Sequence, residues 1–296
     1  MKFDNWKPHC HYLGDLCTPP KGESNLQKFD TVNDNYKKAF REFRDMEDEH
    51  SAAGIKLFDK MMKLKSERDE LDKIKQIPNL SVGCKTKLRQ IYLSETTGRK
   101  KVIKNKYLEK GLMVEEDCIT QYSLLTGCFH KKNTETKEND YIIGTSDFFW
   151  EDIVIDTKAS WDIWTFYDSK GKKIKPLYHW QLDGYMWLYG KYFGRLVYCL
   201  INTPEHLIKA EERKVMYEMF GNEGNMLLAD DLMKSVYQDE CKQIRKNHIF
   251  DDIELKDKVK VFEIERDEDR IDRIITVVEG CRWYLNNLNE IEDDNI

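Results

Sequence analysis

Two aspartates and a lysine are spaced as metal-dependent hydrolysis would require. Within residues 144–158, Glu151 and Asp152 can form the tight turn of a β-hairpin, and this register places Asp147 directly opposite Asp156. Two like charges facing each other destabilise a sheet unless a positive charge lies between them, which a divalent cation provides while its oxygen ligands stay ionised. The pattern therefore predicts a Mg²⁺ or Mn²⁺ site.

Lys158 lies two residues beyond Asp156, so strand alternation places its ammonium on the same face as both carboxylates. There it can hold a water or help to deprotonate it. A hard cation beside a lysine suits attack of a metal-activated water on a phosphodiester. The spacing alone also fits a surface hairpin whose polar residues face solvent.

A helix opened by Gly111 and running to about residue 126 supplies a third carboxylate. Glu115 falls on the same predicted stripe as Leu112, Ile119 and Tyr122, where a buried carboxylate needs a partner such as a metal. If the apolar stripe runs one residue over, Glu115 is instead solvated.

A later helical pattern, residues 178–192, carries Gln181 and Tyr185 four positions apart, so their side chains project together. A glutamine amide can bridge a water or a phosphate, and a tyrosine hydroxyl can donate to a phosphate oxygen. Packing into the core is the alternative for this aromatic helix.

The elements around these residues predict an α/β fold. Short runs rich in β-forming residues occupy 128–131, 141–149, 153–159 and 196–201, and the helix 178–192 separates the last two. The order is helix, three strands, helix, strand, which indicates a central mixed sheet flanked by helices. A last strand near 259–264 and an amphipathic helix follow. Thr203 and Pro204 are predicted to cap and open another helix.

The N-terminal part differs in character. Residues 1–25 predict an irregular arm, and residues 26–80 an inserted, charged helical hairpin with its turn at Ala52–Gly54. Residues 81–296 are expected to form the core that carries these side chains, and it begins with a helix over 85–95 closed by Gly98.

Composition restricts the class of protein. The net charge of −6 is not that of a strongly basic nucleic-acid binder, although a local basic groove would suffice. Eight cysteines without CxxC pairs predict reduced thiols, and His9-Cys10-His11 has no second pair to complete a zinc site. No apolar run approaches the ~20 residues of a membrane span, so a soluble intracellular protein is expected. The local basic clusters are Arg99, Lys100, Lys101, Lys104 and Lys106, then Lys170, Lys172, Lys173 and Lys175.

Four motifs in order resemble the PD-(D/E)XK nuclease superfamily, in its RecB-like, lambda-exonuclease-like and YqaJ-like branch found in bacteriophages. The resemblance implies a restriction-endonuclease-like core. It is carried by Gly111-Leu112-Met113-Val114-Glu115, Gly144-Thr145-Ser146-Asp147, Asp156-Thr157-Lys158 and Gln181-Leu182-Asp183-Gly184-Tyr185-Met186-Trp187.

The resemblance implies a metal held by Glu115, Asp147, Asp156 and the main-chain carbonyl of Thr157. It assigns Lys158 to the attacking water, Gln181 to orienting that water or the phosphate, and Tyr185 to bracing it. Mg²⁺ is the expected cofactor, with Mn²⁺ able to substitute, and no iron–sulfur cluster is expected. The arm from His9 to Pro20, with Thr18, looks like the family's contact to the phosphate at a DNA end. Independently of the resemblance, Arg99, Lys100, Lys101 and Lys104 are candidate DNA contacts because of their charge. Trp161 could stack on a base at a frayed end, and core packing is the favoured alternative for it.

The expected function is an exonuclease on linear double-stranded DNA in phage-type recombination or DNA processing. The alternatives are an endonuclease of the same fold and a non-enzymatic nucleic-acid-binding or assembly protein. Double-stranded DNA ends are the expected partner, with a single-strand annealing protein and further copies of the chain as candidates, and no membrane. The site of action would be the cytoplasm, that of the host if the protein is phage-encoded.

Overall fold

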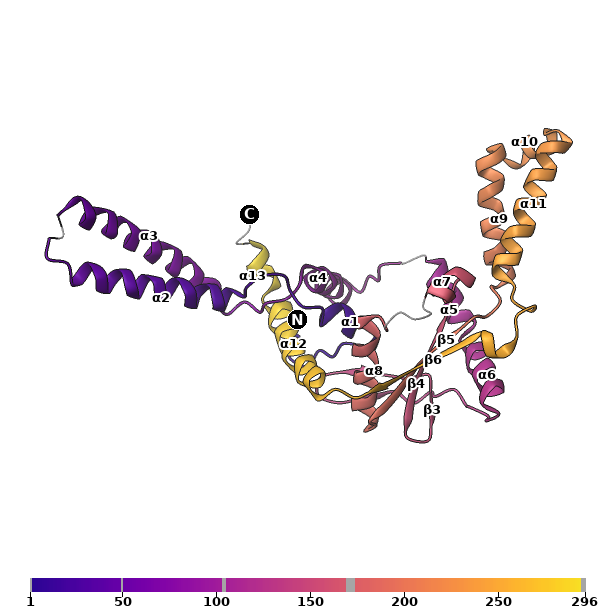
Figure 1. Ribbon diagram of the computed structural model, residues 1–296, viewed down its shortest axis with the longest axis horizontal. Coiled ribbons are helices and arrows are strands. Elements are labelled where there is room, and N and C mark those ends of the chain that lie inside the picture. Colours follow the sequence, from indigo (N-terminus) through magenta and orange to yellow (C-terminus); the bar gives the residue numbers. More distant parts are fainter. Residues whose placement is uncertain (1, 49, 103–104, 169–173, 294–296) are drawn as a thin grey trace. The chain divides into compact units, whose positions relative to one another are not determined.

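The computed structural model describes residues 2–48, 50–102, 105–168 and 174–293 (Figure 1). The chain forms two compact units. Unit 1 comprises Met1–Trp6, Asp15–Lys100 and Arg273–Ile296, and unit 2 comprises Lys7–Gly14 and Lys101–Asp272. The domain boundaries at residues 25 and 80 stay predictions.

Unit 2 is built on a four-stranded mixed sheet in the order β3-β4-β5-β6. β4 and β5 are parallel, and the two outer pairs are antiparallel. The parallel pair is joined by a crossover that contains α7 (Ile163–Asp168) and α8 (Pro176–Tyr189), as parallel strands require. The strands are β3 (Phe148–Trp150), β4 (Ile153–Ala159), β5 (Phe193–Cys199) and β6 (Val259–Glu265).

The β3–β4 hairpin has the register predicted from the sequence. Phe148 pairs with Ile155 and Trp150 with Ile153, and the turn residue Glu151 has φ of 54°. The same register places Asp147 opposite Asp156. The predicted hairpin is therefore confirmed.

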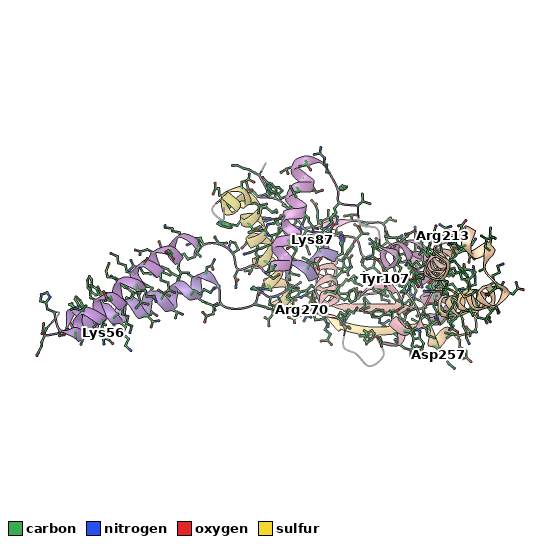
Figure 2. The ribbon with its side chains drawn as sticks, turned by 90° about the horizontal axis from the view of Figure 1, so that it is seen from above. Lys56, Lys87, Tyr107, Arg213, Asp257 and Arg270 are labelled. Atoms are coloured by element: carbon green, nitrogen blue, oxygen red, sulfur yellow. The ribbon has the colours of Figure 1, made fainter. Side chains whose placement is uncertain are left out.

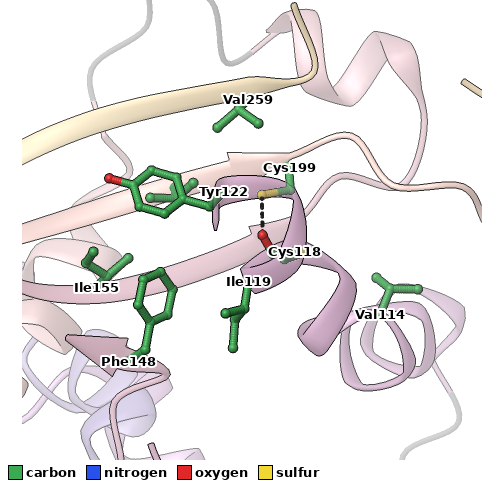
Figure 3. Close-up of a cluster of buried hydrophobic side chains, with 9 residues drawn as sticks. Val114, Cys118, Ile119, Tyr122, Phe148, Ile155, Cys199 and Val259 are labelled. Carbon is green, nitrogen blue, oxygen red and sulfur yellow. Dashed lines mark hydrogen bonds between the residues drawn. The ribbon is translucent and has the colours of Figure 1, made fainter. Parts of the chain in front are cut away.

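Alternate residues of β4 face two different helices. Ile155 packs with Ile119 and Tyr122 of α6 (Glu115–Thr126) in a buried apolar cluster (Figure 3). Asp156 points to the other face, where Gln181 of α8 donates a hydrogen bond to it. The alternation of side chains along β4 thus places apolar residues on one face of the sheet and the candidate site residues on the other.

The helix predicted to open at Gly111 is wrong in its boundaries. Gly111 lies inside α5 (Lys106–Met113), and the chain bends at Val114 (φ −107°, ψ 14°) before α6 starts at Glu115. Leu112 is 67% exposed and shares no stripe with Glu115. The bend arises because α5 buries Lys110, whose Nζ donates to the Trp161 carbonyl, whereas α6 buries apolar residues against the sheet.

Two strand predictions also need correction. Residues 128–131 form no strand, because His130 is buried there against the rings of Tyr122 and Phe148. The predicted strand 141–149 is divided between β2 (Ile143–Gly144), which pairs with β1 (Lys137–Glu138), and β3. The division follows from the N-terminal segment, which bridges His9 to Ile143.

In unit 1, α2 (Asn25–Arg44) and α3 (Ala52–Ile74) pack against each other, with the Phe43 and Phe58 rings 5.6 Å apart (Figure 1). Ala52–Gly54 begin α3 and do not form the predicted turn, because Ser51 caps the helix by accepting from the Gly54 N–H. Many of the hairpin's side chains, such as Lys56, project outward from the helices (Figure 2).

α4 (Val82–Thr97) ends at Gly98, which has φ of 66°, so its predicted closing residue is confirmed. The helix after Pro204 starts at Glu205 without a side-chain cap, and the Thr203 hydroxyl instead contacts His248 Nδ1 at 3.1 Å. The remaining helices are α1 (Leu13–Leu16), α9 (Glu205–Phe220), α10 (Glu223–Leu228), α11 (Asp231–His248), α12 (Glu268–Asn286) and α13 (Leu288–Asp293), with 3₁₀ turns at Cys10–Tyr12 and Leu255–Asp257.

All eight cysteines are free in this structure. Within the described ranges, no helix is both long and apolar enough to cross a lipid bilayer.

Candidate active site

Asp156 is the most buried carboxylate of the predicted site, at 1% exposure. Its Oδ1 accepts a hydrogen bond of 3.1 Å from Gln181 Nε2. Lys158 Nζ lies 2.6 Å from its Oδ2, yet among the described residues Oδ2 receives no well-directed hydrogen bond. A buried carboxylate oxygen therefore has a cation close by but keeps unused acceptor capacity.

The surroundings make Asp156 difficult to ionise. Burial raises the pKa of this carboxyl to about 7; Lys158 lowers it, whereas Asp147 and Glu115 raise it. Burial alone would lower the pKa of Lys158, but Asp156 and Asp147 outweigh burial and raise it. The site thus has an excess of negative charge that one lysine compensates only in part.

Asp147 is fixed by the residue that follows Asp156. Its Oδ2 accepts from both the N–H and the hydroxyl of Thr157, at 2.6 and 2.7 Å. Thr157, for which the resemblance implied a ligand role through its carbonyl, thus orients Asp147 through its two donors. Strand β4 positions both aspartates, one directly and one through Thr157.

Glu115 lies apart from these two carboxylates. It is the first residue of α6, and its Oε2 accepts from Lys132 Nζ at 3.1 Å. Among the described residues, no group of three or more His, Cys, Asp or Glu side chains is arranged to hold a metal ion. Glu115 is close enough to raise the pKa of Asp156, but in this structure it pairs with Lys132. That the three acids share one ion stays a prediction.

Gln181 and Tyr185 do project together from α8. Both are buried, and Gln181 Nε2 donates to the Tyr185 hydroxyl at 3.2 Å as well as to Asp156. Burial raises the pKa of Tyr185, and the negative charge of Asp156 raises it further. The amide therefore ties the tyrosine to the central carboxylate.

Two residues beside the site were missed by the sequence reasoning. Lys158 Nζ lies 5.3 Å from the centre of the Tyr178 ring, and Tyr178 could have been found because it is one helical turn before Gln181. Cys10 is fully buried, and both its own burial and Asp156 raise its pKa. No sequence signal links Cys10 to residues more than a hundred positions away.

Helix α8 is also held in place by the contacts of Asp183 with Asp267 and Arg270, which follow β6. Asp183 is fully buried, forms an ion pair with Arg270 and accepts from the N–H of Asp267 at 3.1 Å (Figure 2 labels Arg270). Burial raises the pKa of Asp183, whereas the hydrogen bond from Arg270 lowers it. We read this pair as holding α8 in place.

The candidate DNA contacts differ in exposure and belong to both units. Arg99, Lys100, Lys101 and Thr18 are exposed, whereas Lys106 pairs with Glu211 at 2.9 Å. Trp161 is 8% exposed and packs edge-on against Tyr107 and His248, which favours a packing role over base stacking. Lys175 is exposed. Lys104, Lys170, Lys172 and Lys173 lie outside the described residues.

The donor set suits a hard divalent cation. Mg²⁺ is commonly bound through one or two carboxylates while it keeps several waters. Asp147 and Asp156 supply two carboxylates, and Asp156 Oδ2 has the unused acceptor capacity that a metal ligand needs. The residues present therefore fit such an ion, with Glu115 as a further donor if it leaves Lys132.

Comparison with solved structures finds one of the same fold along nearly the whole chain, and others with a weaker likeness. A phage-related exonuclease from Haemophilus somnus 129PT aligns over 97% of each chain, with a TM-score of 0.61 and 22% sequence identity. An alkaline exonuclease from Laribacter hongkongensis aligns over 73% of this chain and 86% of its own, with a TM-score of 0.48 and 15% identity. No protein-family model matches the sequence, and no curated protein matches it either. The chain thus shares the fold of the phage-related exonuclease along nearly its whole length.

Proposed function

We propose that this protein is a metal-dependent deoxyribonuclease that degrades linear double-stranded DNA from its ends. The observation that carries the proposal is Asp156: a carboxylate at 1% exposure, beside a second aspartate and a lysine, with one oxygen short of hydrogen bonds. Burial of an incompletely paired carboxylate destabilises the fold, and such groups are typical of functional sites.

Asp147 and Asp156 would hold the ion, and Glu115 would join them. When bound, the ion would supply Lewis-acid polarisation of a phosphodiester and lower the pKa of a water. Lys158, a quarter exposed, can hold a water by its ammonium next to Asp156. Gln181 has both amide hydrogens directed at Asp156 and Tyr185, so it keeps these groups in position.

The exonuclease assignment draws support from the fold shared with the phage-related exonuclease. Under this proposal the substrate is a DNA end, and the process is phage-type recombination or DNA processing. An endonuclease of the same fold would differ by cutting closed circular DNA.

The test is nucleotide release from a linear duplex by the purified protein with Mg²⁺, with and without EDTA. The proposal expects acid-soluble nucleotides from linear DNA, none from covalently closed circles, and none in EDTA. Cleavage of the circles would instead identify an endonuclease. Absence of metal-dependent release from every substrate would leave a nucleic-acid-binding or assembly protein.

A further inference from the structure

The ion pair between Glu115 and Lys132 is a contact that the proposed chemistry does not use. Glu115 opens α6, and Lys132 lies in the loop between α6 and β1. Their charged atoms are 3.1 Å apart, and the side chains are 27% and 38% exposed, respectively. The lysine therefore has open solvent to move into.

Each of the three predicted ligands is neutralised or held by a different group of the chain. Asp156 has Lys158 at 2.6 Å, Asp147 accepts two hydrogen bonds from Thr157, and Glu115 has Lys132. Glu115 also raises the pKa of Asp156, so its charge acts on the buried centre. A cation on Glu115 consequently reduces repulsion among the three acids.

The two lysines differ in how readily they can leave. The Lys158 pair includes a carboxylate with 2% side-chain exposure, and breaking a buried pair is expensive. The Lys132 pair is partly exposed on both sides, and such pairs contribute little to stability. A divalent ion that needs a third carboxylate would therefore displace Lys132 and leave Lys158 in place.

We propose that Lys132 stands in for the metal at Glu115 and is displaced from it when the ion binds. This inference rests on the metal site of the proposed function. Lys132 is then a positioning residue: it holds Glu115 without the ion and competes with the ion for the same carboxylate. Loading of the site exchanges one cation for another.

Under the proposal, removing the charge of Lys132 should increase the affinity for the metal. In K132M, which keeps the length of the side chain without its charge, Mn²⁺ should bind about two- to fivefold more tightly, as loss of a partly exposed competing pair implies. K132R should restore the wild-type affinity. The neighbouring exposed lysine supplies the matched control, K131M, which should leave the affinity unchanged.

The experiment is a Mn²⁺ titration of the full chain without DNA, followed by the electron paramagnetic resonance signal of free Mn²⁺. E115Q and the double variant E115Q/K132M complete a cycle that isolates the pair. The gain from K132M should disappear in the E115Q background. Unchanged or weaker binding by K132M, an equal gain in K131M, or a gain that persists with E115Q would each overturn the proposal.

The outcomes separate this inference from the proposed function. A protein that binds Mn²⁺ with the expected cycle but releases no nucleotide from DNA supports the cation exchange and contradicts the nuclease assignment. Metal-dependent nuclease activity without tighter Mn²⁺ binding by K132M supports the nuclease assignment and contradicts the cation exchange. A wild-type protein that binds no Mn²⁺ contradicts both.

Discussion

At the scale of single residues, the site contains a buried carboxylate that lowers the stability of the fold and is suited to binding a cation. A carboxylate buried as fully as Asp156 is unfavourable unless it is paired, and the pairing from Lys158 and Gln181 leaves one oxygen short of hydrogen bonds. Departures from the usual rules of polar burial concentrate at functional sites. The residues that tolerate this cost are therefore the ones to test first.

Replacing Asp156 by Asn, or Lys158 by Ala, should lower the rate of metal-dependent cleavage by about 10²-fold or more, because each removes a group that contacts the reacting centre. The fold and the affinity for DNA should change little. Single-turnover cleavage of an end-labelled duplex measures the effect. The matched control is D152N, an exposed aspartate in the turn of the same hairpin, which should cleave like the wild type.

The raised pKa of Asp156 predicts a pH dependence of stability in metal-free protein. The carboxyl has a pKa of about 7 when folded and 3.8 as its ordinary value, so the folded state binds the proton more tightly. Stability therefore falls as the pH rises from about 4 to about 7, by at most about 4 kcal/mol at 1.36 kcal/mol per pKa unit. Urea unfolding in EDTA across this range measures it.

The D156N variant isolates this contribution from those of other carboxyl groups. The free energy of unfolding of the wild type minus that of D156N should decrease between pH 4 and pH 7, and Mg²⁺ should flatten the decrease by binding the ionised carboxylate. Parallel curves for the two proteins would show that Asp156 titrates normally.

At the scale of elements, the N-terminal segment and α8 meet over two glycines. A Cβ on Gly144 would lie 2.7 Å from Cys10 Sγ, and one on Gly184 would lie 3.1 Å from the same sulfur and 2.6 Å from Leu13 Cδ1. Both glycines therefore permit a close approach that no side chain would allow. The packing of these segments determines where Tyr185 and Gln181 lie.

G144A should destabilise the protein by about 1–3 kcal/mol, the usual cost of overpacking a filled core, and should also reduce cleavage by shifting Tyr185, whose Cε1 would lie 2.9 Å from the new methyl group. Urea unfolding and cleavage assays measure the two effects. The control is G111A, in the middle of α5 with nothing within 4 Å, which should be neutral or stabilising. Equal stability of G144A and the wild type would refute the close packing.

At the scale of the whole molecule, charge and function are distributed unevenly. Residues 25–75 contain twelve Lys and Arg and twelve Asp and Glu, so the net charge of −6 resides entirely outside the α2–α3 hairpin. All the candidate catalytic residues belong to unit 2, whereas the hairpin belongs to unit 1. The hairpin closes at its base, where Asn25 Nδ2 donates to the Ile74 carbonyl at 3.2 Å.

Replacement of residues 25–75 by a short Gly-Ser linker should leave a folded protein with unchanged Mn²⁺ affinity, because the ends to be joined already lie side by side and no candidate ligand is removed. Circular dichroism and the Mn²⁺ titration check this. Net charge is also unchanged, so any loss of DNA affinity would identify a local contact made by the hairpin. Loss of metal binding would contradict the assignment of the site to unit 2 alone.

The sequence by itself determined the features that depend on neighbours along the chain. A turn at Glu151 and Asp152 and a period of two fix the opposition of Asp147 and Asp156, and a spacing of four on a helix brings Gln181 to Tyr185. These parts of the site could be predicted because local geometry alone sets them.

Only the tertiary structure decided the features that depend on residues distant in sequence. Glu115 pairs with Lys132 and not with the aspartates, Thr157 donates to Asp147, and Cys10 fills the space beside Gly144. The bend at Val114 likewise results from two helices burying different faces. No periodicity encodes such contacts, because they arise from which surfaces meet when the sheet and its helices pack together.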